Sequence, residues 1–220
     1  MKSMIKKVLV DWCVRATCLS ALFILWGCAS GAHVIPSISI PSPLIESFPL
    51  TVGIYYSAEL KDYVHEEPKG RQKYVIELGG GNQEQVFDTC YGGLFEKTVT
   101  LESLDLTNVE VDGIFHPEIT GVTLTTPAEN VRDYYEVMVH YTIQLLDPAG
   151  NELHKWSVNG YGRVNRHDYG SVVERTSDAL EQATENALRD ASTIIIESFN
   201  PRQRPVVVSN WLNSNRSNTE

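Results

Sequence analysis

A run of residues that alternates between apolar and polar side chains constrains the fold most. From Tyr135 to Leu146 every second residue is apolar or aromatic, and the residues between them are mostly polar. This period of two predicts a strand with one buried face and one solvated face. Turn-forming residues occupy Asp147 to Asn151, and residues 152–164 have the composition of a partner strand. We therefore predict an antiparallel hairpin, which needs a second layer to cover its apolar face.

Two helices and several shorter strands are predicted around this hairpin. Apolar residues recur at spacings of three and four between Asn82 and Phe95, where Asn82 with Gln85 resembles a capping box. A longer helix is predicted from about Ser171 to Phe199, with Ala179, Ala183, Ala187 and Ala191 forming a stripe that lets it lie close to a neighbour. Short strands are predicted at residues 50–56, 73–78, 98–101, 109–111 and 114–124, with an edge strand at 206–208.

This order of elements predicts an α+β fold. We expect a two-layer sandwich, in which two main helices pack on one mixed, mostly antiparallel sheet of about five strands. The triplet Gly79–Gly81 between a predicted strand and helix indicates a turn that needs positive φ, because it lacks the spacing of a phosphate-binding loop.

The first 27 residues differ from the rest of the chain. Lys2, Lys6, Lys7 and Arg15 give a basic start, and an apolar run of about a dozen residues ends at Trp26. This pattern is typical of a secretory signal peptide. The run is shorter than the roughly 20 apolar residues that span a bilayer.

The sequence Leu25-Trp26-Gly27-Cys28 at the end of this run resembles the lipobox of bacterial lipoproteins. The resemblance implies cleavage after Gly27 and a diacylglyceryl group on Cys28, although Trp26 departs from the small residue usual there. By the same family rule, Ala29 in place of Asp implies sorting to the outer membrane, with the domain facing the periplasm. The alternative is an ordinary signal peptide that contains a cysteine, and either Met1 or Met4 could be the start.

The net charge of the chain argues against two classes of partner. Four positive and one negative residues give the predicted signal peptide a net charge of +3, so the remainder carries −13 against −10 for the whole chain. Such acidity argues against nucleic acid, whose phosphates require Lys and Arg, and against electrostatic adhesion to anionic lipid. We therefore expect the lipid on Cys28 to be the contact with the membrane.

Four segments follow from these features. We predict a signal peptide at residues 1–27, a Pro-rich tether at 28–49, a single α+β periplasmic domain at 50–201 and a partly disordered C-terminal extension at 202–220.

The sequence predicts no catalytic residue, no metal site and no cofactor. There is no nucleophile elbow, and the six histidines lack the spacing of a zinc site. Cys90 lies on the apolar face of the first predicted helix, so we expect it to be buried. An enzyme is therefore the least favoured class.

An interaction surface is predicted on the hairpin and the loop after it. Its candidate residues are aromatic or basic, which are types that favour interfaces: Tyr134, Trp156, Tyr161, Arg163 and Arg166. The alternative is that the aromatic side chains only pack across the strands.

The predicted domain also resembles a loose group of small outer-membrane lipoproteins related to the N-terminal domain of TolB and to the CsgG, LpoB, PelC and YajG proteins. The resemblance rests on residues 52–56, 87–95, 147–151 and 187–191. It implies a non-enzymatic accessory or adaptor of an envelope assembly, secretion or export machine, with an envelope protein as partner and homo-oligomerisation left open. The alternative is a periplasmic binding module for a lipid, glycan or other small ligand.

Overall fold

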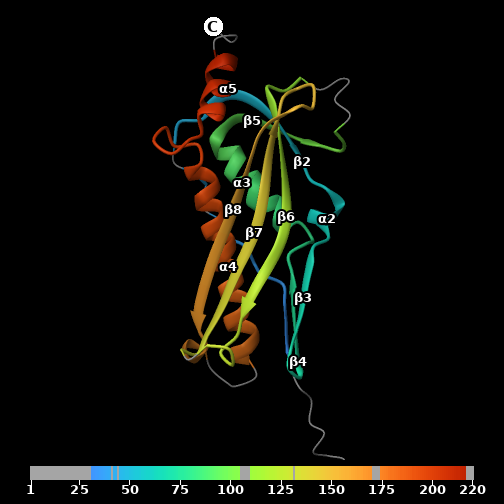
Figure 1. The fold of residues 1–220 in the computed structure, drawn as a ribbon, viewed down its shortest axis with the longest axis vertical. Helices are drawn as coiled ribbons and strands as arrows, with labels where there is room; N and C mark the ends of the chain where they lie inside the picture. The colour runs from blue at the N-terminus through green and yellow to red at the C-terminus, as the bar shows by residue number, and fades with distance from the viewer. Residues whose placement is uncertain are drawn as a thin grey trace, which may run out of the picture.

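The computed structural model of this 220-residue chain describes residues 31–40, 42–43, 45–104, 110–130, 132–169 and 174–216. This part of the chain folds into a mixed α+β structure with two sheets and four α-helices (Figure 1). The predicted signal peptide, which ends at Gly27, and the predicted lipidation site Cys28 lie outside the described residues.

The large sheet is mixed and contains five strands in the order β5-β2-β6-β7-β8. Strand β2 pairs in parallel with β5 and β6, whereas β7 pairs antiparallel with β6 and β8. The large sheet is therefore mixed, as predicted, and most of its paired residues lie in the antiparallel pairs that β7 forms with β6 and β8. The bounds are β2 Phe48–Tyr55, β5 Phe95–Leu101, β6 Gly113–Thr125, β7 Tyr134–Leu146 and β8 Glu152–Asn165.

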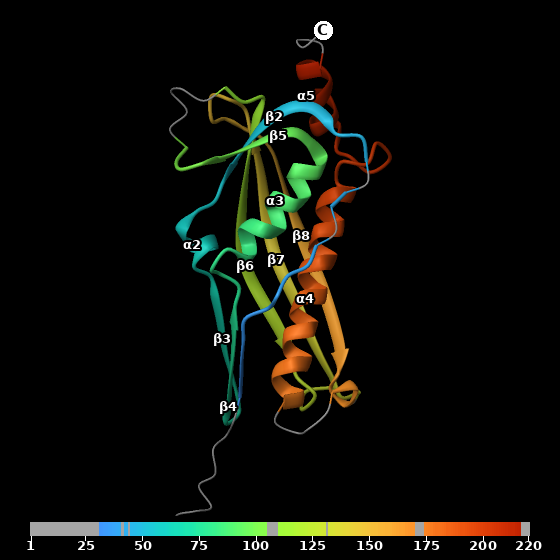
Figure 2. The same ribbon diagram turned by 180° about the vertical axis from the view of Figure 1, so that it is seen from behind.

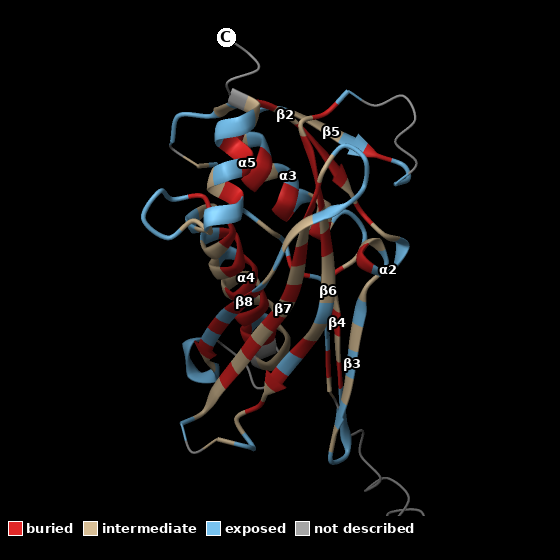
Figure 3. Cartoon of the chain, turned by 45° about the horizontal axis from the view of Figure 1, so that its top comes forward, coloured by how far each residue is buried: buried red, intermediate tan, exposed pale blue. Residues whose placement is uncertain are grey.

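The predicted hairpin is confirmed as β7 and β8. Burial alternates along β7, where Val137, Val139 and Tyr141 are buried and the residues between them are partly exposed (Figure 3). The Asp147 carboxylate accepts hydrogen bonds from the N–H groups of Ala149 and Asn151, at 2.9 and 2.8 Å, which fixes the turn.

Two helices cover one face of the large sheet, as expected (Figure 2). Helix α3 spans Asn82–Leu94 and helix α4 spans Glu174–Glu197. Helix α3 begins after Gly81, which has a φ of 93° and makes no side-chain cap, so the predicted Asn82 capping box is wrong. The positive φ values of Gly80 and Gly81 confirm the predicted turn.

A second, three-stranded sheet is the main feature that the sequence analysis missed. Its order is β1-β4-β3, with bounds Ala32–Val34, Gln72–Glu77 and Val64–Lys69. Residues 73–78 were therefore correctly predicted as a strand but assigned to the wrong sheet. The Tyr74 and Tyr135 rings lie 6.5 Å apart, so the small sheet packs on the same face of the large sheet as the helices.

The N-terminal segment packs on the domain over much of the predicted tether. Ala32 and Val34 are buried in the core, and the carbonyls of Ile38 and Ser39 accept hydrogen bonds from Gln85 of α3 and Arg189 of α4. Repeated prolines keep this segment extended, and Ile38 and Ile40 pack partly buried against the core, whereas Ile35 and Ile45 stay exposed.

The C-terminal segment forms one helix where an edge strand at residues 206–208 is predicted. Helix α5 spans Val206–Arg216, and its Trp211 ring lies at the edge of the core, where the indole N–H donates to the Asp112 carbonyl at 2.9 Å. The short helix α2, Ala58–Lys61, and the 3-10 helix η1, Arg166–Asp168, complete the described elements.

Candidate interaction surface

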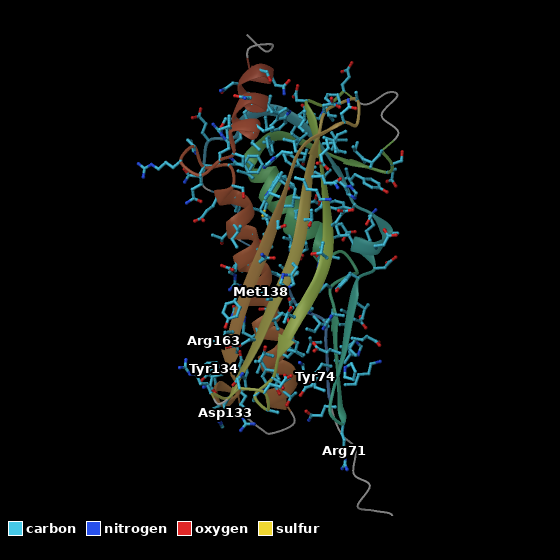
Figure 4. All side chains as sticks on the ribbon, viewed as in Figure 1. Arg71, Tyr74, Asp133, Tyr134, Met138 and Arg163 are labelled. Atoms are coloured by element: carbon cyan, nitrogen blue, oxygen red, sulfur yellow. The ribbon has the colours of Figure 1, made fainter. Side chains whose placement is uncertain are left out.

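The outer face of the large sheet, opposite to α3 and α4, carries a group of aromatic, basic and thioether side chains. We define the sheet patch as Tyr134, Glu136 and Met138 of β7 with Tyr161 and Arg163 of β8. The register pairs Glu136 with Arg163 and Met138 with Tyr161, so the five side chains form one continuous group. Figure 4 shows Tyr134, Met138 and Arg163 along the lower part of the strands.

Side chains of the sheet patch interact with one another: Arg163 with Tyr134, and Glu136 with Tyr161. The Arg163 guanidinium carbon lies 4.6 Å from the centre of the Tyr134 ring, within the range of a cation–π interaction. Partial burial and the Glu136 carboxylate raise the pKa of Tyr161, and nearby Arg163 opposes this effect. Tyr161 nevertheless keeps 41% of its surface exposed, so a large aromatic side chain remains available to a partner.

Strand β8 is tightly packed beneath the sheet patch, because helix α4 lies directly on its other face. A Cβ atom on Gly160 or Gly162 would collide with the backbone of α4 near Ala187 or Ala183, so only glycine permits this approach. The predicted alanine stripe is therefore confirmed as the surface of α4 that packs on the sheet. Asp190 of α4 also accepts a hydrogen bond from the Tyr161 backbone N–H at 2.9 Å.

The structure brings together three of the five predicted surface residues. Tyr134, Tyr161 and Arg163 share the sheet patch, but Trp156 faces the other side of β8 and lies 6.5 Å from the Phe115 ring in the core. Arg166 lies beyond the end of β8 and forms an ion pair with Asp133 at 2.8 Å. Trp156 is therefore wrongly placed in the predicted surface, and Glu136 and Met138 were missed.

A polar ladder lies beside the sheet patch on the same face. His140 contacts Thr123 Oγ1 at 3.0 Å through Nε2 and Asn159 Oδ1 at 2.9 Å through Nδ1, which joins β6, β7 and β8. Because both ring nitrogens have partners, we interpret His140 as a structural residue of the exposed sheet face.

Two of the cavities in the described part of the chain are large enough to consider as ligand sites, and both lie away from the sheet patch. One of about 350 Å³ is lined by apolar side chains at the C-terminal end of α4, including Ile196 and Phe199. The other, of about 630 Å³, lies beside α2, and His116 contributes a buried Nε2 atom that has no hydrogen-bond partner among the described residues. A cavity lined by the buried Val and Tyr residues of the hairpin would favour a ligand site inside the sandwich. Neither of these two cavities has that lining.

Among the described side chains there is neither a reactive thiol nor a set of metal ligands. Cys90 is buried, with its thiol 3.7 Å from the Ser192 carbonyl, and burial raises the pKa of that thiol to about 12. A thiol with such a pKa is a poor nucleophile at neutral pH. Within the residues that the structure describes, no cluster of three or more His, Cys, Asp or Glu side chains could hold a metal ion.

None of the helices in the described part of the chain is both long and apolar enough to cross a membrane.

Comparison with known proteins relates the chain to others through its fold. No family model and no curated protein matches it. Among solved structures, protein XCC0632 from Xanthomonas campestris, of family model DUF330, superposes with a TM-score of 0.50 at 8% identity, over 83% of this chain and 99% of that protein. This likeness shows a shared fold.

Two further structures are more distant. A minor lipoprotein from Acinetobacter baumannii gives a TM-score of 0.45 at 10% identity, over 74% of this chain and 97% of its own. The hypothetical protein CT253 from Chlamydia trachomatis gives 0.36 at 11% identity, over 68% and 96%.

Proposed function

We propose that this chain is a lipid-anchored cell-envelope protein that acts as a non-enzymatic accessory or adaptor, binding a partner protein of an envelope assembly, secretion or export machine through the sheet patch. The anchor is the lipid on Cys28, and Ala29 favours the outer membrane with the domain in the periplasm. This proposal combines the lipobox-like sequence at residues 25–28 with the exposed surface of the domain.

The sheet patch is the observation that carries the binding role. Tyr, Met and Arg are enriched in protein–protein interfaces, and Glu136 and Arg163 add charge that can select a partner. Strand β8 is held by close packing on α4 and by the hydrogen bond from the Tyr161 N–H to Asp190, so little backbone order has to be gained when a partner binds. No described helix covers this part of the sheet, whereas α3 and α4 cover the opposite face.

The anchor is tested by replacing the proposed acylated residue. We expect Cys28→Ser to abolish uptake of labelled fatty acid and to leave an uncleaved precursor in cells. Cys18→Ser is the matched control, because Cys18 belongs to the predicted signal peptide and should leave processing unchanged. Normal processing and labelling of the Cys28→Ser protein would contradict the anchor.

The binding surface is tested by site-specific photo-crosslinking in cells. A photoreactive residue at position 161 should give an adduct with an envelope protein, and the same residue at Ser157 should not. Both side chains are exposed on β8 and face the same side, so the two positions differ in whether they lie in the sheet patch. An adduct of twice the chain mass would identify a second copy as the partner, and equal adducts at both positions would exclude the sheet patch as the site.

A further inference from the structure

The point at which the chain enters the domain limits how the domain can sit on a membrane. Gly31 packs against the backbone of Lys73, and Ala32 pairs with Tyr74. Strand β1 runs parallel to β4, so the chain enters beside the start of β4, next to the turn at Gly70 and Arg71. Figure 4 shows Arg71 at the extremity of the small sheet, at the same end of the molecule as Asp133 and Tyr134.

Only Ala29 and Ser30 separate Cys28 from Gly31. Even a fully extended chain spans no more than about 3.5 Å per residue, so an acylated Cys28 stays within about 10 Å of Gly31. Strand β7 alone, with 13 residues, is roughly 40 Å long. The long dimension of the domain is therefore several times the reach of the linker.

The distribution of charge favours contact with the membrane through the end of the domain at the β3–β4 turn rather than along the side that carries α4. The side of α4 carries Asp178, Glu181, Glu185, Asp190 and Glu197 against the single cation Arg189, counting its described side chains. Laying this side on anionic lipid would bring like charges together. Arg71 is exposed at the β3–β4 turn and has no ion pair among the described residues.

We infer that the end of the domain at the β3–β4 turn lies against the phospholipid headgroups of the membrane, with Arg71 facing the lipid phosphates and α5 at the distant end. This inference rests on the proposed lipid anchor at Cys28. It also places the sheet patch near the bilayer, because Tyr134 and Arg163 lie at the same end as Arg71 (Figure 4). A partner bound there would be a membrane-proximal part of an envelope protein.

The orientation can be measured on the full-length lipidated protein in vesicles of phosphatidylethanolamine and phosphatidylglycerol. A fluorophore is attached to Gln72→Cys, which keeps the neighbouring Arg71, or, as the matched control, to Asn210→Cys on the exposed side of α5. Cys90 does not interfere, because it is buried and its thiol has a raised pKa. We expect a lipid with a spin-labelled headgroup to quench the label at position 72 at least five-fold more strongly than the label at position 210.

Uptake of labelled fatty acid, measured in the same preparation, distinguishes failure of the proposed lipid anchor from failure of the inferred orientation. If the protein carries lipid but both positions are quenched equally, the inferred orientation is wrong and the proposed anchor stands. If the protein takes up no lipid, both are wrong.

A linker variant tests whether the short connection sets this orientation. Twenty Gly/Ser residues inserted between Ala29 and Ser30 would give a flexible chain with a mean span of about 25 Å. We expect the lipidated variant to lose most of the quenching at position 72. Unchanged quenching in this variant would show that the short connection between Cys28 and Gly31 does not set the orientation of the domain.

Discussion

At the scale of single residues, Gly160 and Gly162 decide how closely α4 approaches the sheet. We predict that Gly162→Ala lowers the free energy of unfolding by about 2–3 kcal/mol, because its Cβ would collide with the backbone of α4 and force the helix away. Chemical denaturation followed by circular dichroism measures this loss.

Gly92 is the matched control for Gly162, because an alanine at position 92 should have the opposite effect on stability. It lies in α3 with open space where a Cβ would be, so Gly92→Ala should stabilise the protein by about 0.5–1 kcal/mol through its better helix propensity. Equal effects of the two substitutions would contradict the close packing of α4 on β8.

The composition of the sheet patch was only partly predictable from the sequence. Residue type alone identifies the Tyr and Arg residues of the hairpin as candidates, but it also includes Trp156, which lies five positions from Tyr161. In a continuous strand, an odd separation places two side chains on opposite faces. The same alternation, applied to β7, would also have placed Glu136 and Met138 beside Tyr134.

At the scale of elements, the N-terminal strand β1 is part of the core rather than a tether. Val34 is buried and the adjacent Ile35 is 59% exposed. We predict that Val34→Asp destabilises the protein by roughly 3 kcal/mol, because it buries a charge without a partner. Ile35→Asp should change the stability by less than about 0.5 kcal/mol.

Thermal denaturation of the two variants gives the comparison, and limited proteolysis near Gly31 shows whether the segment detaches. A tolerated Val34→Asp substitution would mean that β1 does not contribute to the folded core.

The sequence predicted elements with a strong local pattern and missed those that depend on distant partners. The helix α3 and the strand β7 follow from their own periodicity, and β2, β6 and β8 follow from their local composition. Strand β1 has only three residues and β3 contains Pro68 among charged residues, so neither has a distinctive pattern. Residues 206–208 are β-branched and favour a strand locally, but burial of Trp211 and Leu212 on one face favours the helix α5.

At the scale of the whole molecule, an ion-pair network joins the small sheet to the turn between β6 and β7. Lys69 of β3 lies 2.8 Å from Glu129 and 2.9 Å from Glu67. The hydrogen bond from Lys69 and those from Thr126 hold the pKa of Glu129 below its ordinary value of 4.5. A group with a lowered pKa in the folded state adds stability above its ordinary pKa, and this stability is lost as the pH falls through the lowered value.

We therefore predict that Glu129→Gln is less stable than the parent protein at pH 7 and that the difference shrinks as the pH falls below 4.5. The effect should be small, since the Glu129 side chain is 43% exposed and solvent screens the pair. Urea denaturation at several pH values measures the difference. Glu152→Gln, at an exposed carboxylate without a described ion pair, is the control and should show no such trend.

The hydrogen bond between Asp190 and the Tyr161 N–H has a consequence for how molecules of this protein meet one another. Strand β8 is the outermost strand of the large sheet, and the free backbone groups of such a strand can recruit a strand from another chain. By occupying one of these donors, Asp190 obstructs the continuation of the sheet from molecule to molecule. Chains crowded side by side on a surface would aggregate readily through an open edge, so this single carboxylate favours their remaining separate.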